Sequence, residues 1–169
     1  GPYTTLRWMP TGGVNEKNLL DYIKFNKIVA CGGTWMVKKD LIEAENWDEI
    51  ERLTRQAVQT MLGLRVDHIG INTENEQEAQ AAAKLFVDMF GMKEKVGNSS
   101  IFVGENEVEI MKKMYLGKNG HIAIATHTLP RAIAYFRARG YEFREETVTD
   151  KAAYFKDEIA GFAIHLVQR

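Results

Sequence analysis

The stretch Val66-Asp67-His68-Ile69-Gly70-Ile71-Asn72-Thr73 returns later in the chain as Gly120-His121-Ile122-Ala123-Ile124-Ala125-Thr126. In both copies a histidine opens an alternating run, with isoleucine at the first and third positions after it and threonine at the fifth. This alternation predicts a strand that carries its histidine on one face. The two histidines are 53 residues apart, a spacing typical of an internal repeat.

The rest of each copy follows the same order of elements. After the first strand we expect a helix at residues 76–90 that stops at Gly91, and after the second a helix at residues 129–139 between a Thr128 cap and Gly140. Each helix is followed by three short alternating runs, at residues 93–96, 100–103 and 107–112 in the first copy and 142–148, 152–156 and 162–167 in the second. The sequence therefore predicts an α+β fold of two paired βαβββ modules.

Composition indicates an ordinary globular chain. Of its 169 residues, 45% are hydrophobic, which is enough to form a core. The net charge of −1 is spread evenly, without the basic stripe that binding to nucleic acid requires. No apolar run approaches the roughly 20 residues of a membrane helix. From the charge pattern and the apolar runs we expect neither a nucleic-acid nor a membrane partner. The single cysteine, Cys31, cannot form an internal disulfide, so we expect a reducing, cytoplasmic setting.

Two strand-like stretches near the start of the chain each lead into a pair of glycines. Residues 6–10 are followed by Thr11-Gly12-Gly13, and residues 28–31 by Gly32-Gly33-Thr34. Helices are expected after them, at residues 16–25 and more weakly at 40–44. Backbone N–H groups beside glycine can cradle an anion, and the two threonine hydroxyls add donors. The six residues are candidates for phosphate binding, with a pair of simple tight turns as the alternative.

A third helix is expected at residues 46–62. Asn46 followed by Glu49 resembles a capping box, and Gly63 is a typical stop. The short stretch 63–65 then marks a boundary between a first domain, residues 1–64, and a second, residues 65–169.

The first domain resembles a known family over about residues 1–62. The similarity lies in Trp8-Met9-Pro10-Thr11-Gly12-Gly13, Ala30-Cys31-Gly32-Gly33-Thr34 and Trp47-Asp48-Glu49-Ile50, which resemble the last two βα units of the 2-dehydro-3-deoxyphosphogluconate (KDPG) and 4-hydroxy-2-oxoglutarate (KHG) aldolases. The resemblance implies the end of a (β/α)8 barrel in a homo-oligomeric, usually trimeric, lyase that uses a lysine Schiff base and no cofactor. It also implies a small phosphorylated or 2-keto acid substrate, with its phosphate at Thr11, Gly12, Gly13, Gly32, Gly33 and Thr34.

The catalytic residues of that family have no counterpart in this chain. The Schiff-base lysine lies on the sixth barrel strand and the glutamate acid/base on an earlier one, so both would precede Gly1. Lys24, Lys27, Lys38 and Lys39 lie at helix or loop positions, whereas a Schiff-base lysine must be desolvated. We therefore expect the C-terminal part of a longer aldolase, with no catalytic residue of its own and inactive as an aldolase.

The second domain carries a candidate metal site. His68, Glu109, His121 and His165 occupy the first and last strands of the two modules, at equivalent places. Three imidazoles and one carboxylate suit Zn, Fe, Mn, Co or Ni, although a histidine on an apolar strand is more often an ordinary core residue. Glu107, two residues before Glu109, competes for the carboxylate position, and His127 is expected at the surface.

Paired βαβββ modules around one metal resemble the glyoxalase and vicinal-oxygen-chelate superfamily over residues 65–169. In that superfamily the fourth ligand is commonly Glu or Gln, so His165 is a departure. The resemblance implies a metal-dependent isomerase, lyase or dioxygenase, and the alternative is a domain that binds a metabolite or assembles the aldolase without catalysis.

Overall fold

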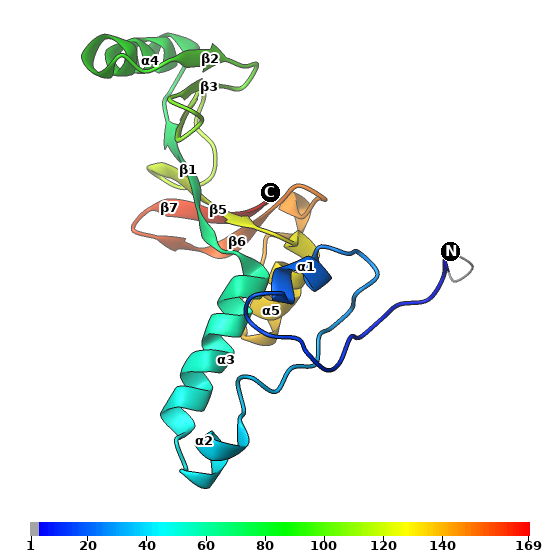
Figure 1. The fold of residues 1–169 in the computed structure, drawn as a ribbon. Helices are drawn as coiled ribbons and strands as arrows, with labels where there is room; N and C mark the ends of the chain where they lie inside the picture. Colours follow the sequence, from blue (N-terminus) through cyan, green and yellow to red (C-terminus); the bar gives the residue numbers. More distant parts are fainter. Residues whose placement is uncertain (1–3) are drawn as a thin grey trace. The chain divides into compact units, whose positions relative to one another are not determined.

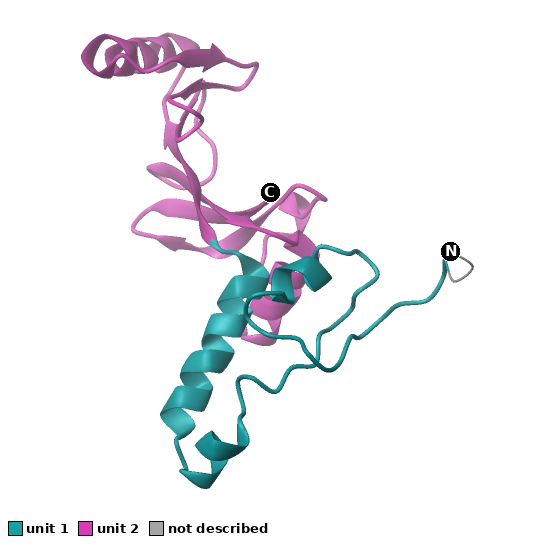
Figure 2. Ribbon diagram, viewed as in Figure 1, with its two compact units in different colours: residues 1–64 teal, residues 65–169 magenta. Residues whose placement is uncertain are grey.

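The computed structural model describes residues 4–169. The chain divides into two compact units, residues 1–64 and 65–169 (Figure 2). Each unit has its own buried residues, so each is described by itself.

The first unit contains the helices α1 (Leu19–Ile23), α2 (Lys39–Glu43) and α3 (Trp47–Leu62). Its core is built from Val14, Leu19, Ile23 and Ala57. The side chain of Asn46 accepts a hydrogen bond from the Glu49 N–H at the start of α3, and Gly63 ends the helix in the left-handed conformation, both as predicted. No helix within residues 4–169 is both long and apolar enough to cross a membrane.

The two strands expected in the first unit are present only as isolated parallel bridges. One joins Trp8 to Ile28 and the other joins Thr11 to Gly32. Pro10 lies between these two contacts and has no N–H to donate, which interrupts a continuous ladder. The side-by-side parallel arrangement is therefore as predicted, but regular strands at 6–10 and 28–31 are not found.

The second unit follows the repeat closely. The first module contains β1 (Arg65–Asn72), α4 (Glu76–Phe90), β2 (Glu94–Val96), β3 (Ser100–Val103) and β4 (Val108–Met111). The second contains β5 (Gly120–Thr126), α5 (Leu129–Ala138), the 3-10 helix η1 (Glu145–Thr147), β6 (Ala152–Ile159) and β7 (Phe162–Gln168).

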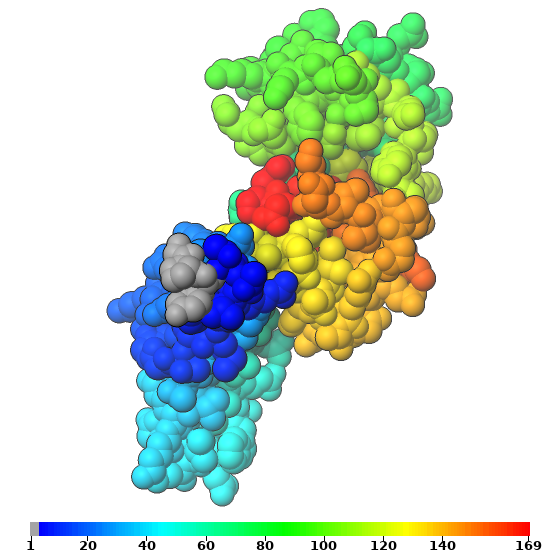
Figure 3. Space-filling model, turned by 90° about the vertical axis from the view of Figure 1, so that its right-hand side faces the viewer, coloured from blue at the N-terminus to red at the C-terminus, as the bar shows by residue number. Residues whose placement is uncertain are grey.

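The seven strands form one sheet in the order β2-β3-β4-β1-β5-β7-β6 (Figure 1). The first strands of the two modules, β1 and β5, pair antiparallel at its centre, and each pairs on its other side with the last strand of its own module in parallel. Helix α4 packs on β3 and β4, and α5 on β7. In Figure 3 the first module, in green, and the second, in yellow to red, form the two lobes of this unit.

The strand register is symmetric about the centre of the sheet. His68 pairs with Ala123, and Gly70 pairs with His121, so each histidine lies opposite the residue two positions beyond the other. Gly70 in turn pairs with Glu109, and Ala123 with His165. The pseudo-twofold axis therefore relates His68 to His121 and Glu109 to His165, as the sequence repeat predicts.

The expected strand at residues 142–148 is wrong. In its place Phe143 makes one bridge to Phe155, and residues 145–147 form η1. The Thr147 hydroxyl explains the difference, because it accepts the Tyr154 N–H at 3.0 Å and donates to the Arg144 carbonyl at 2.7 Å. The Tyr154 N–H thus donates to a side-chain hydroxyl and not to the carbonyl of a neighbouring strand.

Candidate metal centre

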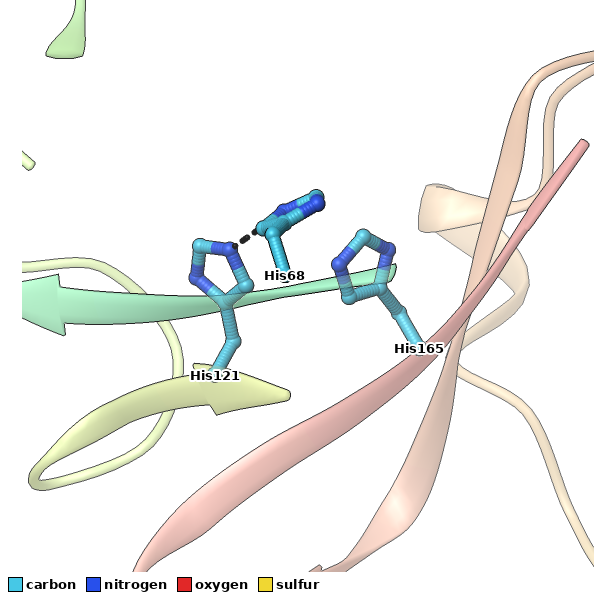
Figure 4. A group of neighbouring side chains, drawn as sticks. All are labelled: His68, His121 and His165. Atoms are coloured by element: carbon cyan, nitrogen blue, oxygen red, sulfur yellow. Dashed lines mark hydrogen bonds between the residues drawn. The ribbon is translucent and has the colours of Figure 1, made fainter. Parts of the chain in front are cut away.

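Three histidines from three strands point toward one another (Figure 4). His68 lies on β1, His121 on β5 and His165 on β7, and all three are buried. One nitrogen from each can be chosen so that all three lie within 4.8 Å of one another.

A carboxylate oxygen completes a tight triangle of donors. The Nε2 atoms of His68 and His121 are 3.2 Å apart, and Oε2 of Glu109 is 3.3 Å from the first and 3.2 Å from the second. Donors at about 2.0–2.1 Å from a tetrahedral metal ion are about 3.3–3.4 Å from one another. The three atoms therefore have the spacing of one face of a coordination shell.

His68 is oriented by a chain of charged groups. Its Nδ1 lies 2.9 Å from Asp67, and Arg169 donates two hydrogen bonds to the same carboxylate at 2.7 and 2.6 Å. The β1 register shifts between Val66 and His68, and this irregularity lies at Asp67, beside the histidine that it contacts. The hydrogen bonds from Arg169 lower the pKa of Asp67 to about 2. Burial lowers the pKa of His68, but the bonds to Glu109 and Asp67 outweigh burial and raise it.

Glu109 is held with one oxygen toward the histidines. Its Oε1 accepts a hydrogen bond from the buried hydroxyl of Ser100 at 2.5 Å, on the neighbouring strand β3, which leaves Oε2 for the cluster. Burial raises the pKa of the Glu109 carboxyl, but the bonds from His121, His68 and Ser100 outweigh burial and hold the pKa well below its ordinary value. The carboxylate is therefore charged and directed at the site.

His165 differs from the other two histidines. It is 6% exposed, yet neither ring nitrogen has a hydrogen-bond partner within residues 4–169. Its ring stacks on Tyr154, with the ring centroids 4.4 Å apart and the planes 8° from parallel. Burial and the nearby His121 and His68 lower the pKa of His165 to about 3, so the imidazole is neutral near pH 7.

This donor set fits a divalent metal. Buried imidazole nitrogens without partners are costly unless something binds them, and Nδ1 of His121 is also without a partner in the described chain. Imidazoles and an ionised carboxylate are ligand types of Zn, Fe, Mn, Co or Ni. The group whose donor atoms all lie within 4.8 Å of one another consists of the three histidines, and Glu109 lies close to His68 and His121.

The other sequence candidates lie elsewhere. Glu107 is exposed in the turn before β4 and accepts the Glu105 N–H, so it does not compete with Glu109. His127 is half-buried rather than at the surface, and the metal-ligand cluster found among the described residues does not include it.

Sequence reasoning missed Asp67, Ser100 and Tyr154, which contact His68, Glu109 and His165 in turn. Asp67 carried a signal, because it directly precedes a candidate ligand, but plain alternation assigns it to the opposite face. Ser100 and Tyr154 carried none, since their contacts depend on pairing between strands that the local pattern does not specify.

The six phosphate candidates lie on two neighbouring loops of the first unit. The Thr11–Gly32 bridge joins the loops, and Gly13 and Thr34 line one cleft of about 820 Å³ together with Lys38 and Lys39. Gly12 and Gly13 have φ of 81° and 69°, a conformation that favours glycine. A Cβ on Gly33 would lie 1.8 Å from the Trp35 ring, so a side chain cannot be accommodated there without rearrangement.

Comparison with known proteins links the first unit to aldolases. The family model of KDPG and KHG aldolases matches residues 1–53. A 2-dehydro-3-deoxy-phosphogluconate aldolase of Haemophilus influenzae is 53% identical over 58 residues, which are 34% of this chain and 27% of that aldolase. The corresponding aldolase of Pseudomonas aeruginosa is 41% identical over 59 residues, 35% of this chain and 27% of its own length. The chain thus spans about a quarter of the length of the curated relatives that it matches.

Comparison of structures gives a different set of proteins. A methylmalonyl-CoA epimerase from Mycobacterium tuberculosis is 16% identical, with a TM-score of 0.45, and the match covers 61% of this chain and 86% of that one. A glyoxalase/bleomycin resistance protein/dioxygenase superfamily member from Vibrio splendidus is 16% identical, with a TM-score of 0.35, covering 63% of this chain and 99% of the other. The resemblance of the first unit to the aldolases, noted in the sequence, recurs in the family and sequence comparisons.

Proposed function

We propose that residues 65–169 hold one divalent metal ion and act as a metal-dependent enzyme on a small, oxygen-rich ligand. The observation that supports this most directly is the triangle formed by His68, His121 and Glu109, with donor atoms 3.2–3.3 Å apart. The fourth donor is His165, whose two nitrogens have no other partner within the described residues.

Each supporting residue has a defined task in this proposal. Asp67 accepts from Nδ1–H of His68, which leaves the Nε2 lone pair facing the site. Ser100 holds one oxygen of Glu109, so the carboxylate offers a single donor. When bound, the metal would supply Lewis-acid polarisation of a ligand oxygen, which suits an isomerase or a lyase.

A polar cavity lies beside His68. Its volume is about 370 Å³, and its walls are formed by Asp67, Phe102, Glu105, Asn106, Glu107 and Arg169. The Phe102 ring meets the His68 ring edge to face, with the centroids 5.9 Å apart. The size suits a small molecule, and the polar lining suits a ligand rich in oxygen atoms.

Metal titration of the purified protein tests this proposal. Zn, Mn, Co or Ni should bind with one equivalent and raise the melting temperature, because a ligand that binds only the folded state stabilises it. His121→Gln should lower the affinity at least tenfold, whereas His127→Ala, our matched control, should leave it unchanged. The proposal is refuted if less than a tenth of an equivalent of metal binds and none of these metals raises the melting temperature. The histidine cluster would then be structural, and the domain would serve metabolite binding or assembly.

A second proposal concerns the first unit. We infer that residues 1–64 are the end of a class I KDPG/KHG-type aldolase, part of a homo-oligomer that acts on a phosphorylated or 2-keto acid. The family match over residues 1–53 and the cleft shared by Gly13 and Thr34 support this. The phosphate would be held by backbone N–H groups and threonine hydroxyls, with Lys38 and Lys39 at the same cleft.

The chain itself should lack retro-aldol activity. Lys24, Lys38 and Lys39 are exposed, and the Lys27 ammonium donates to the Thr4 carbonyl, so none of these four is a desolvated free amine. Borohydride reduction in the presence of pyruvate should give no covalent adduct by mass spectrometry. An adduct on any lysine of the chain would refute the expectation. Thr34→Val should weaken the binding of inorganic phosphate and leave the result of the borohydride experiment unchanged.

A further inference from the structure

We infer that Tyr154 is the positioning residue that orients His165 toward the metal site. The inference rests on the proposed metal binding and adds a residue outside the four donors. It starts from the contrast between His68, which has a hydrogen-bonded carboxylate to fix its ring, and His165, which has none among the described residues.

Ring stacking takes the place of that hydrogen bond. Tyr154 and His165 are direct partners in the β6–β7 register, and their rings lie almost parallel at 4.4 Å. The other neighbours of the His165 ring meet it at steep angles, His121 at 77° with centroids 5.1 Å apart and His68 at 66° and 5.6 Å. Tyr154 is therefore the ring that lies flat against His165, while the other two histidines meet it edge on.

Tyr154 is itself held firmly. Its N–H donates to the Thr147 hydroxyl at 3.0 Å, and its carbonyl accepts from the Arg144 N–H at 2.8 Å. The Tyr115 ring meets its ring edge to face, with the centroids 5.8 Å apart. Residues 144–147, where a strand was expected, thus fix the backbone of the residue that carries the stack.

The stack should matter for metal binding and not only for folding. A histidine that is free to turn about its χ angles must be ordered when the metal binds, which lowers affinity. With Tyr154 present, the ring is already confined to one plane. Phenylalanine at 154 keeps this surface, whereas leucine or methionine removes the flat aromatic face.

Titration with Co(II), followed by its visible absorption, tests the inference. Tyr154→Phe should bind within about twofold of the parent protein, and Tyr154→Leu about tenfold more weakly, the low end of the loss seen for residues that orient ligands. Tyr154→Leu should also shift the absorption bands toward those of His165→Gln, because both changes disturb the same ligand. Tyr141→Leu is the matched control, since Tyr141 contacts Phe136 and Phe155 instead of a histidine.

A double variant separates positioning from general destabilisation. If Tyr154 acts through His165, then adding Tyr154→Leu to His165→Gln should weaken binding less than twofold further. Should Tyr154→Leu not fold, Tyr154→Met, which is similar in length, replaces it in both backgrounds. The inference is overturned if the non-aromatic variants bind Co(II) as tightly as the parent does. It is also overturned if the Tyr154 substitution lowers the affinity as much in the His165→Gln background as in the parent protein. Failure of the parent protein to bind Co(II) would instead refute the metal proposal, and the inference with it.

Discussion

At the residue scale, the candidate site depends on groups that hold the four donors as much as on the donors themselves. His68 is fixed by Asp67, which is in turn fixed by Arg169. Glu109 is fixed by Ser100 from the neighbouring strand. Partners of this kind set the tautomer and direction of a ligand, so their removal affects binding although they do not touch the metal.

Asp67→Asn should therefore weaken metal binding by about 10- to 100-fold, the range typical of such partners. The amide can still accept from His68, but it carries no charge and loses the ion pair with Arg169. Competition titration with a chromophoric chelator measures the change. Asp88→Asn is the control, because this exposed carboxylate on α4 pairs with Lys84 and not with a histidine. Equal effects of the two substitutions would contradict the assigned role of Asp67.

The stability of the metal-free protein should fall as the pH is lowered below 6.5. The pKa of His165 is lowered to about 3 in the folded state, so the unfolded chain binds its proton first, and stability declines from pH 6.5 toward 3. His68 has a raised pKa and contributes its full stabilisation throughout this window. One pKa unit is about 1.4 kcal/mol, so the loss by pH 4.5 is roughly 2–3 kcal/mol at most. Urea unfolding between pH 7 and 4.5 measures the loss of stability. If the free energy of unfolding of His165→Gln depends on pH as steeply as that of the parent protein, the pH dependence does not come from His165.

The four candidate ligands could be identified from the sequence repeat, and three of them, His68, His121 and His165, lie close together, but the residues that contact them could not be identified. The repeat of a histidine before two alternating isoleucines points to His68 and His121, and the register then brings Glu109 and His165 to equivalent places. Asp67 contacts His68 at an irregularity in β1, and the alternating pattern of polar and apolar residues does not predict this irregularity. Tyr154 lies in the predicted strand 152–156, but its contact with His165 depends on the pairing of that strand with β7.

At the element scale, local signals predicted how the longer helices α3 and α4 end. Helix α3 begins after the predicted cap Asn46, and α3 and α4 end at the predicted stops Gly63 and Gly91. The predicted cap of α5, Thr128, makes no side-chain cap hydrogen bond. Local signals failed at residues 142–148, where a strand was predicted but residues 145–147 form η1 and the Thr147 hydroxyl bonds to Arg144 and Tyr154. The pattern of polar and apolar residues does not predict which side chains will form hydrogen bonds with the backbone.

The cap of α4 offers a test of how separate stability and metal binding are. The Asn75 side chain accepts from the Glu78 N–H at 3.0 Å, so Asn75→Ala should lower the free energy of unfolding by about 1 kcal/mol. Metal affinity should stay the same, because α4 packs on β3 and β4 through Ala79 and Ala83 and supplies no donor. Thermal unfolding measures the change in stability, and metal titration measures the affinity. Asn75→Ser should restore the stability, and a loss of affinity in Asn75→Ala would show that α4 shapes the site.

At the scale of the whole molecule, the two units differ in how much apolar surface they bury. The first unit has a small core around Val14, Leu19 and Ile23, while large apolar side chains such as Trp8 and Met9 are about half exposed or more. The second unit has a continuous sheet with a helix packed on strands of each module. Isolated bridges in the first unit leave its extended segments with few backbone partners among the described residues.

The first unit should therefore open more readily than the second. The amides of Val29 and Gly32, each bonded across a single bridge, should exchange hydrogen much faster than those of Ile124 and Leu166 in the sheet. Exchange followed by NMR or mass spectrometry measures the difference. Self-association could cover the exposed apolar side chains and slow exchange, so the experiment is run at two protein concentrations at least tenfold apart. Equal protection of the two pairs of amides at both concentrations would contradict the expectation, because it would mean that the small core of residues 1–64 holds its extended segments as firmly as the seven-stranded sheet holds its centre.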